Sequence, residues 1–138
     1  MRVRSEIELE EADGMLAAAE AEAVKNGWAV SVAVVDEGGH LLAFRRLPGA
    51  SKSSAQIAIE KARCSAITRR PTSFFEDMVS AGHIGAITLA GVIPMGGGLP
   101  ALFEGHVVGG IAVSGVKSEF DVQIAEAGLA FLYRCEGP

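Results

Sequence analysis

Three histidines are the first residues of this chain that could carry chemistry. His40 and His106 each follow a glycine at the end of a turn, and His83 lies in a glycine-flanked loop. Their wide spacing matches no local metal-binding motif, so each is either a solvated turn residue or a metal ligand. Imidazole is a common protein ligand of haem iron. His83 is the strongest candidate for that role, because glycine neighbours let a flat ligand approach the backbone.

A second candidate is a helix, predicted over residues 52–69, that carries Lys61 and Arg63 in an otherwise apolar run. Ile57 and Ala58 lie one turn before Lys61, which places the lysine over a half-buried surface. A lysine in that setting either extends its amine to water or meets an anion. A solvated side chain and a carboxylate-binding role are therefore both open for Lys61.

The glycine run Gly96, Gly97 and Gly98, followed shortly by Pro100, is the third candidate. Consecutive glycines indicate positive φ or a close approach of the backbone, which fits either a tight corner of a sheet or a ligand cradle. A nucleoside triphosphate loop would need Lys-Ser/Thr after the last glycine, so that class of site is excluded. The apolar segments around Glu104-Gly105 predict a β-hairpin directly downstream.

Composition narrows the classes of function. A chain of 138 residues with 49% hydrophobic and 6% aromatic residues predicts one domain, residues 1–138, with an aliphatic core. The net charge of −5 argues against nucleic-acid binding. The apolar runs are too short to span a membrane, and the N-terminus lacks an apolar signal core, so we expect a cytoplasmic protein. Cys64 and Cys135 do not suffice for a disulfide scaffold or a zinc site; Cys64 is expected to be buried, with a reactive thiol as the alternative.

The candidate residues must be positioned by nine predicted elements in the order α-β-β-α-α-β-β-β-α. Ser51, Thr72 and Ser118 are the expected N-caps of the later helices, with Asp121 completing a capping box after Ser118. Because hairpins join most strands, we predict an α+β fold with an antiparallel five-stranded sheet flanked by helices. The expected helices are 9–26, 52–69, 72–79 and 118–133, and the strands are 30–35, 40–46, 91–94 and the two segments around Glu104-Gly105.

The last predicted helix is apolar around most of its circumference. Such a helix must be covered on more than one side. In a chain this small, a neighbouring subunit is the expected second cover, which predicts a homo-oligomer.

Four segments together resemble the GlcG/HbpS-like family: VSVAVVDEGGHLLAFRRLPGA, AIEKAR, GGGLPALFEGHVVGGIAVSG and SEFDVQIAEAGLA. The resemblance covers about residues 8–132 and implies a profilin-like sheet flanked by helices, assembled into oligomers. Some members bind haem, without one shared axial ligand. The Lys61-Ala62-Arg63 triplet, the glycine-proline loop and Asp121 match positions that the family keeps. His83 stands where relatives often carry arginine, which removes a cation and adds a potential metal ligand.

Two functional classes follow. The first is a small-molecule-binding protein for haem or another planar anionic ligand, with Lys61 and Arg63 facing carboxylates, the loop Gly96, Gly97, Gly98 and Pro100 lining the site, and His83 as metal ligand. The second is a cofactor-independent enzyme, an isomerase, lyase or hydrolase acting on a small organic acid or an aromatic ring-cleavage product. There Lys61 would anchor the carboxylate while His83 or Asp121 moves a proton, which requires these groups to converge.

Overall fold

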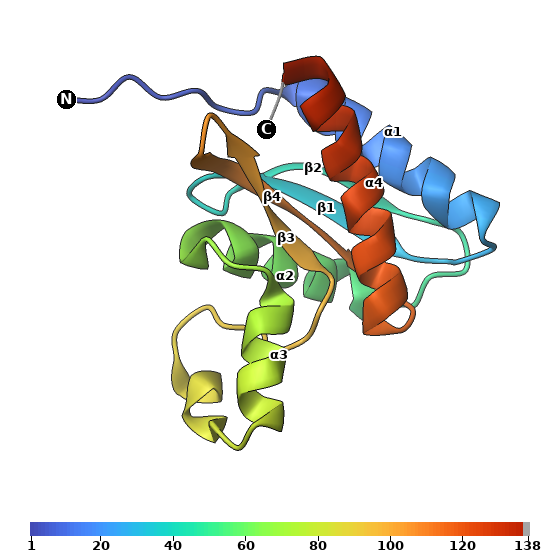
Figure 1. Ribbon diagram of the computed structural model, residues 1–138. Helices are drawn as coiled ribbons and strands as arrows, with labels where there is room; N and C mark the ends of the chain where they lie inside the picture. The colour runs from blue at the N-terminus through green and yellow to red at the C-terminus, as the bar shows by residue number, and fades with distance from the viewer. Residues whose placement is uncertain (137–138) are drawn as a thin grey trace.

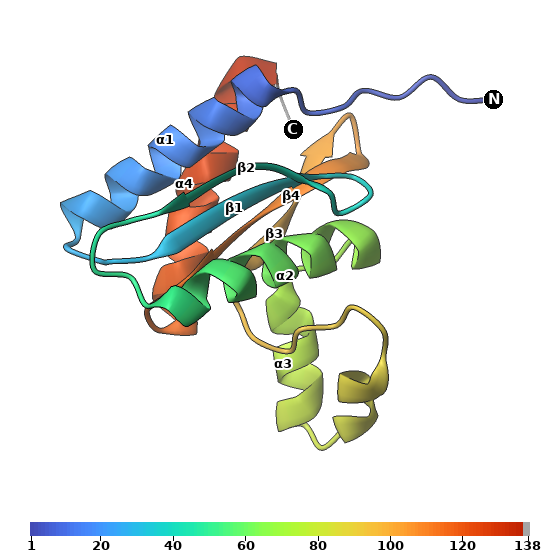
Figure 2. The same ribbon diagram turned by 180° about the vertical axis from the view of Figure 1, so that it is seen from behind.

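The centre of the protein is an antiparallel sheet of four strands in the order β2-β1-β4-β3, seen in the computed structural model, which describes residues 1–136 (Figure 1). Helices cover both faces of this sheet (Figures 1 and 2). The elements are α1 (Leu9–Lys25), β1 (Ser31–Asp36), β2 (Leu41–Arg46), α2 (Lys52–Thr68), α3 (Thr72–Ser80), the 3-10 helix η1 (Ile84–Thr88), β3 (Gly98–Phe103), β4 (His106–Ser114) and α4 (Ser118–Glu136).

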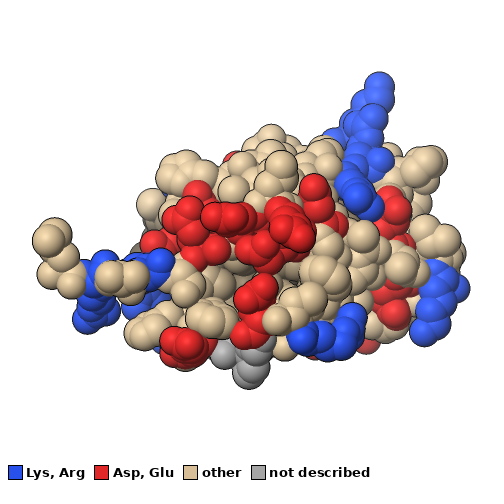
Figure 3. Space-filling view, turned by 90° about the horizontal axis from the view of Figure 1, so that it is seen from above, with Lys and Arg blue, Asp and Glu red and all other residues tan. Residues whose placement is uncertain are grey.

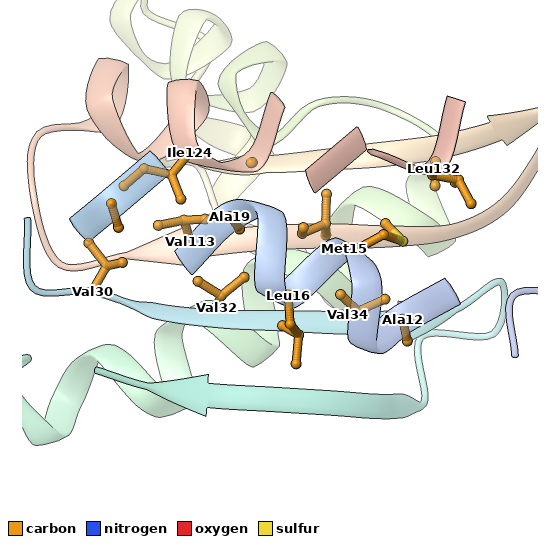
Figure 4. Close-up of a cluster of buried hydrophobic side chains, with 14 of the residues drawn as sticks. Ala12, Met15, Leu16, Ala19, Val30, Val32, Val34, Val113, Ile124 and Leu132 are labelled. Carbon is orange, nitrogen blue, oxygen red and sulfur yellow. The ribbon is translucent and has the colours of Figure 1, made fainter. Parts of the chain in front are cut away.

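Strand β1 is buried on both faces, and its alternate residues enter two separate cores. Val32 and Val34 pack with residues of α1 and α4 on one side (Figure 4). Ala33 and Val35 pack with alanines of α2 on the other side. Successive side chains of a strand point to opposite faces, so one β-branched strand supplies both cores. The result is a three-layer arrangement with α1 and α4 on one face and α2 on the other.

Small residues let α2 lie close to the sheet. Ala58, Ala62 and Ala66 are spaced by one helical turn and are buried against β1 and β4. Across from them, a Cβ at Gly110 would stand 2.8 Å from the carbonyl oxygen of Ala62. The sheet and helix therefore approach nearly backbone to backbone, and a larger residue at either surface would separate the layers.

The prediction of a fifth strand at residues 91–94 was wrong, although the α+β class with an antiparallel sheet is confirmed. The backbone donors of this segment find acceptors outside the sheet. The Val92 N–H donates to Leu89 at 3.3 Å, and the Ile93 N–H donates to the Cys64 thiol at 3.4 Å. Pro94 has no N–H to offer a neighbouring strand. An apolar run of strand length thus packs on α2 as an irregular loop.

Ser51 caps α2 as predicted, since its hydroxyl accepts a hydrogen bond from the Ser54 N–H. The other two predicted caps were wrong. Pro71 is the N-cap of α3, so Thr72 is already helical, and its hydroxyl instead accepts from Gly98 N–H at 2.9 Å. Ser118 begins α4, and its hydroxyl donates to Glu76 at 3.3 Å. Thr72 thus joins α3 to β3, and Ser118 joins α4 to α3, and neither hydroxyl caps its own helix.

Two sides of helix α4 are covered by other parts of the same chain. One side contacts the sheet, and another contacts α1, where Phe131 fills the space beside Gly14. A Cβ at Gly14 would stand 2.1 Å from that ring, so the two helices cross in close contact. The sheet and α1 therefore cover two sides of α4 within the same chain. Neither α4 nor any other helix in the described part of the chain is long and apolar enough to cross a membrane.

Candidate functional site

Lys61 and Asp121 form a buried ion pair between α2 and α4. The Lys61 Nζ lies 3.4 Å from the Asp121 Oδ2, and the two side chains are only 1% and 3% exposed. The Lys61 ammonium also donates to the Val113 carbonyl at 3.1 Å. Asp121 accepts a further hydrogen bond from the Val116 N–H at 3.2 Å. The pair thus links α2, β4 and the start of α4.

Burial shifts the pKa of both partners toward their neutral forms. Loss of solvent lowers the pKa of Lys61, and the attraction of Asp121 offsets part of that change. Burial raises the pKa of Asp121 to about 6, against the opposing effects of Lys61 and the backbone donor at Val116. A perturbed lysine–carboxylate pair is typical of catalytic sites, but structural ion pairs show the same shifts.

The glycine run covers this ion pair. A Cβ at Gly97 would lie 2.5 Å from the Val113 carbonyl oxygen and 2.9 Å from the Lys61 Nζ. A Cβ at Gly98 would lie 2.7 Å from the Lys61 carbonyl oxygen. Gly97 also has φ of +129°, a conformation that side chains disfavour. The space beside Lys61 is therefore filled by the protein itself, and the ligand contacts expected of these glycines stay predictions.

Pro100 lies apart from the ion pair, on the outer strand β3. An edge strand tolerates proline, because the missing N–H faces no neighbour. Glu76 was not anticipated, yet it fixes the loop from outside, accepting from the Gly96 N–H at 3.3 Å and from the Ser118 hydroxyl. No local spacing marks Glu76, because its partners lie 20 and 42 residues away.

His83 is not brought to Lys61 and Asp121. It is exposed, immediately precedes η1, and donates its backbone N–H to Met78 at 2.9 Å. No hydrogen bond or ion pair joins His83 to either residue within the described chain. Arg63 is also exposed, and its aliphatic stem packs beside Gly39. The proton-transfer and metal-binding roles expected of His83 stay predictions.

The described residues 1–136 contain no cluster of three or more His, Cys, Asp or Glu side chains able to hold a metal ion. Cys64 is buried as predicted, and burial raises the pKa of its thiol. A raised thiol pKa disfavours the reactive thiolate.

The two Gly-His turns lie at one end of the sheet. Because β1 pairs antiparallel with β4, Asp36 lies opposite Gly109, and both hairpin turns extend beyond that point. The β3–β4 turn consists of Glu104 and Gly105, both with positive φ, as tight hairpin turns require. Figure 2 shows the two turns near α2 and the N-terminal tail.

A hollow of about 540 Å³ lies at this end, and we call it the basic hollow. That volume falls in the ordinary range of small-molecule pockets. The sequence did not predict it, because the N-terminal tail, α2 and a hairpin turn contribute to its walls. The residues of the basic hollow that matter below are Arg2, Arg4, Glu37, Ile67, Arg69 and His106.

Known proteins share this arrangement of sheet and helices. A family model described as "haem degrading protein HbpS-like" matches residues 7–130. The chain belongs to the HbpS-like family. This confirms the resemblance inferred from the sequence segments.

Individual relatives extend the comparison. The protein GlcG of Escherichia coli K12 is 41% identical over 103 residues, which cover 75% of this chain and 77% of GlcG. A double mutant of HbpS from Streptomyces reticuli is 34% identical, covers 96% of this chain and 90% of its own, and has a TM-score of 0.88. A crystal structure of PduOC in complex with haem is 25% identical, covers 92% and 95% of the two chains, and has a TM-score of 0.84.

Proposed function

We propose that this protein binds a small molecule and that its ligand is haem. The observation that carries the proposal is the relative PduOC, which has the same fold over 92% of this chain and was crystallised as a haem complex. Membership of the HbpS-like family supports the same ligand. Haem, when bound, would supply a redox-active iron.

The chemistry of the basic hollow fits such a ligand. Haem presents two carboxylates and an iron with open axial positions, so it needs cations, a donor atom and apolar walls. Arginine binds carboxylates with two parallel hydrogen bonds, and the basic hollow has three arginines. His106 is exposed there and offers an imidazole nitrogen. The ion pair of Lys61 and Asp121 offers no accessible cation to a ligand, because both side chains are enclosed and the lysine charge is met by the aspartate.

Titration of the protein with hemin tests the proposal. We expect the Soret band to shift and to saturate at a fixed stoichiometry in the micromolar range. A protein of similar size without a haem site serves as the control for surface adsorption. A linear, unsaturated increase equal to that of the control would contradict haem binding.

The catalytic alternative, an enzyme acting on a small organic acid, stays a prediction. Lys61 and Asp121 converge as it requires, whereas His83 does not join them. Substrate could reach Lys61 only if the loop at Gly97 moved away.

Homo-oligomer formation also stays a prediction, although its basis moves from α4 to another surface. Ile84, Ile87 and Leu89 of the η1 region are 66%, 59% and 53% exposed. The same region lies beside α3, and the two project together from the body of the molecule (Figures 1 and 2). Exposed apolar groups on a projection are typical of contact surfaces. Sedimentation at micromolar concentration should detect an assembly, and a monomer would contradict it.

A further inference from the structure

We propose that the basic hollow is the haem site of this protein, with His106 as the iron ligand and Arg2 and Arg69 as the carboxylate partners. This inference rests on the haem-binding function proposed above and assigns it to a place. It also replaces His83 as the preferred iron ligand. Charge, apolar exposure and the position of His106 support it separately.

The charge of the basic hollow favours an anion. Three arginines face one glutamate there, in a protein whose net charge is −5. Arg4 already pairs with Glu37 at 3.2 Å. Arg2 and Arg69 form no ion pair within residues 1–136. Two cations are thus available for two carboxylates. Figure 3 shows the contrast, with basic side chains on the N-terminal tail and acidic ones gathered on the face seen from above.

Apolar side chains line the same hollow. Ile67 and Leu102 are each 37% exposed, although large apolar side chains are usually buried. They come from α2 and β3, two elements far apart in the sequence. A planar ring needs broad apolar contact, and aliphatic side chains provide it where aromatic ones are scarce.

His106 is the histidine best placed for such a ligand. It lines the basic hollow at the first residue of β4, where the backbone is fixed by pairing with Phe103. His40, at the neighbouring turn, directs its Nδ1 toward Asp36 at 3.3 Å. His83 lies outside this end of the sheet, in the loop after α3.

Two probes separate the contributions of iron and carboxylates. Hemin reports on both, whereas metal-free protoporphyrin IX presents the same carboxylates without iron. We expect His106→Ala to abolish the shift of the Soret band and to weaken hemin binding at least about tenfold, while protoporphyrin IX still binds. Arg2→Gln and Arg69→Gln should each weaken both probes about tenfold, the usual effect of losing a charged hydrogen bond.

Matched controls come from the same chain. His83→Ala removes the competing candidate ligand, and Arg46→Gln removes an exposed arginine at the opposite end of β2. Both should bind hemin as the wild type does. Because the substituted residues are exposed, circular dichroism and thermal unfolding should remain unchanged. Arg69→Glu reverses the charge and should weaken both probes further.

The outcomes distinguish this inference from the proposed function. If the wild type fails to bind hemin, both are overturned. If it binds hemin at a fixed stoichiometry and His106→Ala, Arg2→Gln and Arg69→Gln leave binding unchanged, only the assignment of the site is overturned. Loss of the Soret shift in His83→Ala instead of His106→Ala would also overturn the assignment and restore the first candidate. Saturable hemin binding by the wild type, with the losses expected for His106→Ala, Arg2→Gln and Arg69→Gln, supports both haem binding and the assignment of its site.

Discussion

Two basic regions of this protein have opposite environments. Lys61 is 1% exposed and its charge is met by Asp121 within the chain. Arg2 and Arg69 are exposed, and no acidic group among the described residues pairs with them. A buried charge must be compensated by the protein, whereas an exposed charge is compensated by water and can exchange water for a ligand. The charge of Lys61 is therefore compensated within the chain, whereas the two arginines can exchange water for a ligand.

The sequence left two interpretations open for Lys61, a solvated side chain and a cation that binds a carboxylate ligand. The burial of Lys61 contradicts the first interpretation. The carboxylate that it meets is Asp121, 60 residues away in the same chain. The following predictions test whether the two regions differ as described.

The largest effect is expected from breaking the buried pair. Lys61→Met leaves Asp121 buried without its cation, which should lower the free energy of unfolding by about 3–5 kcal/mol. Urea unfolding followed by circular dichroism measures this loss. Arg69→Met is the matched control, and its effect should stay within about 0.5 kcal/mol because the residue is exposed.

A double variant sharpens this test. Lys61→Met with Asp121→Leu removes both charges, so the desolvation cost disappears together with the attraction. We expect the double variant to be more stable than Lys61→Met alone. If the double variant were less stable than either single variant, the hydrogen bonds to Val113 and Val116 would dominate rather than the charges.

The free energy of unfolding should depend on pH because Asp121 has different pKa values in the folded and unfolded states. Its pKa is about 6 in the folded state, against 3.8 as its ordinary value. Between these values the folded state holds a proton that the unfolded state has released. The free energy of unfolding should therefore fall, on the order of 2–3 kcal/mol, as the pH rises through this window, and should level off above it.

Asp121→Asn provides the control, because an amide does not titrate. The free energies of unfolding of the wild type and of this variant are compared at about pH 4 to pH 8, an interval that spans both pKa values. Their difference isolates the contribution of the carboxyl group. A flat difference would mean that Asp121 keeps an ordinary pKa despite its burial.

The glycine loop should show a smaller cost. Gly97→Ala places a methyl group against the Val113 carbonyl at positive φ, and we expect a loss of about 1–3 kcal/mol. Gly27→Ala is the matched control, since Gly27 has φ of +71° with no atom near its added Cβ. The difference between the two variants combines the contact of the added methyl group with the different φ of the two glycines, +71° and +129°. Equal losses would mean that the contact with Val113 adds no cost at position 97.

Local signals in the sequence account for most of the elements but not for the sites. The β-branched run of β1 and the cap at Ser51 act through neighbouring residues, so they could be predicted. The segment 91–94 has the same apolar character as a strand. It forms a loop because Ile93 contacts Cys64 of α2, Val92 bonds to Leu89 and Pro94 has no N–H. The partners of Lys61 depend on how α2 and α4 cross the sheet, which no local spacing encodes.

The basic hollow could not be predicted from the sequence either, because it also depends on contacts between distant residues. The likeness of the Gly39-His40 and Gly105-His106 turns is visible in the sequence. Their common location is not, because it follows from the antiparallel pairing of β1 with β4. The tail residue Arg4 reaches the same end through Glu37, 33 residues away. Long-range pairing thus forms the hollow from residues that no local sequence motif marks.

The smallest effect on stability is expected at the rim of the basic hollow. Arg4 and Glu37 are 45% and 42% exposed, so breaking their ion pair by Arg4→Ala should lower the free energy of unfolding by less than about 0.5 kcal/mol. The same change leaves Glu37 as an uncompensated negative charge beside Arg2 and Arg69. Hemin binding should therefore weaken, and Arg4→Ala with Glu37→Gln should recover part of it. Unfolding in urea and hemin titration at low and high salt measure the two effects, since exposed charges are screened by salt. A large loss of stability with unchanged hemin binding would mean that this pair holds the fold and that the basic hollow binds no anion, which would reverse the contrast with Lys61 and Asp121.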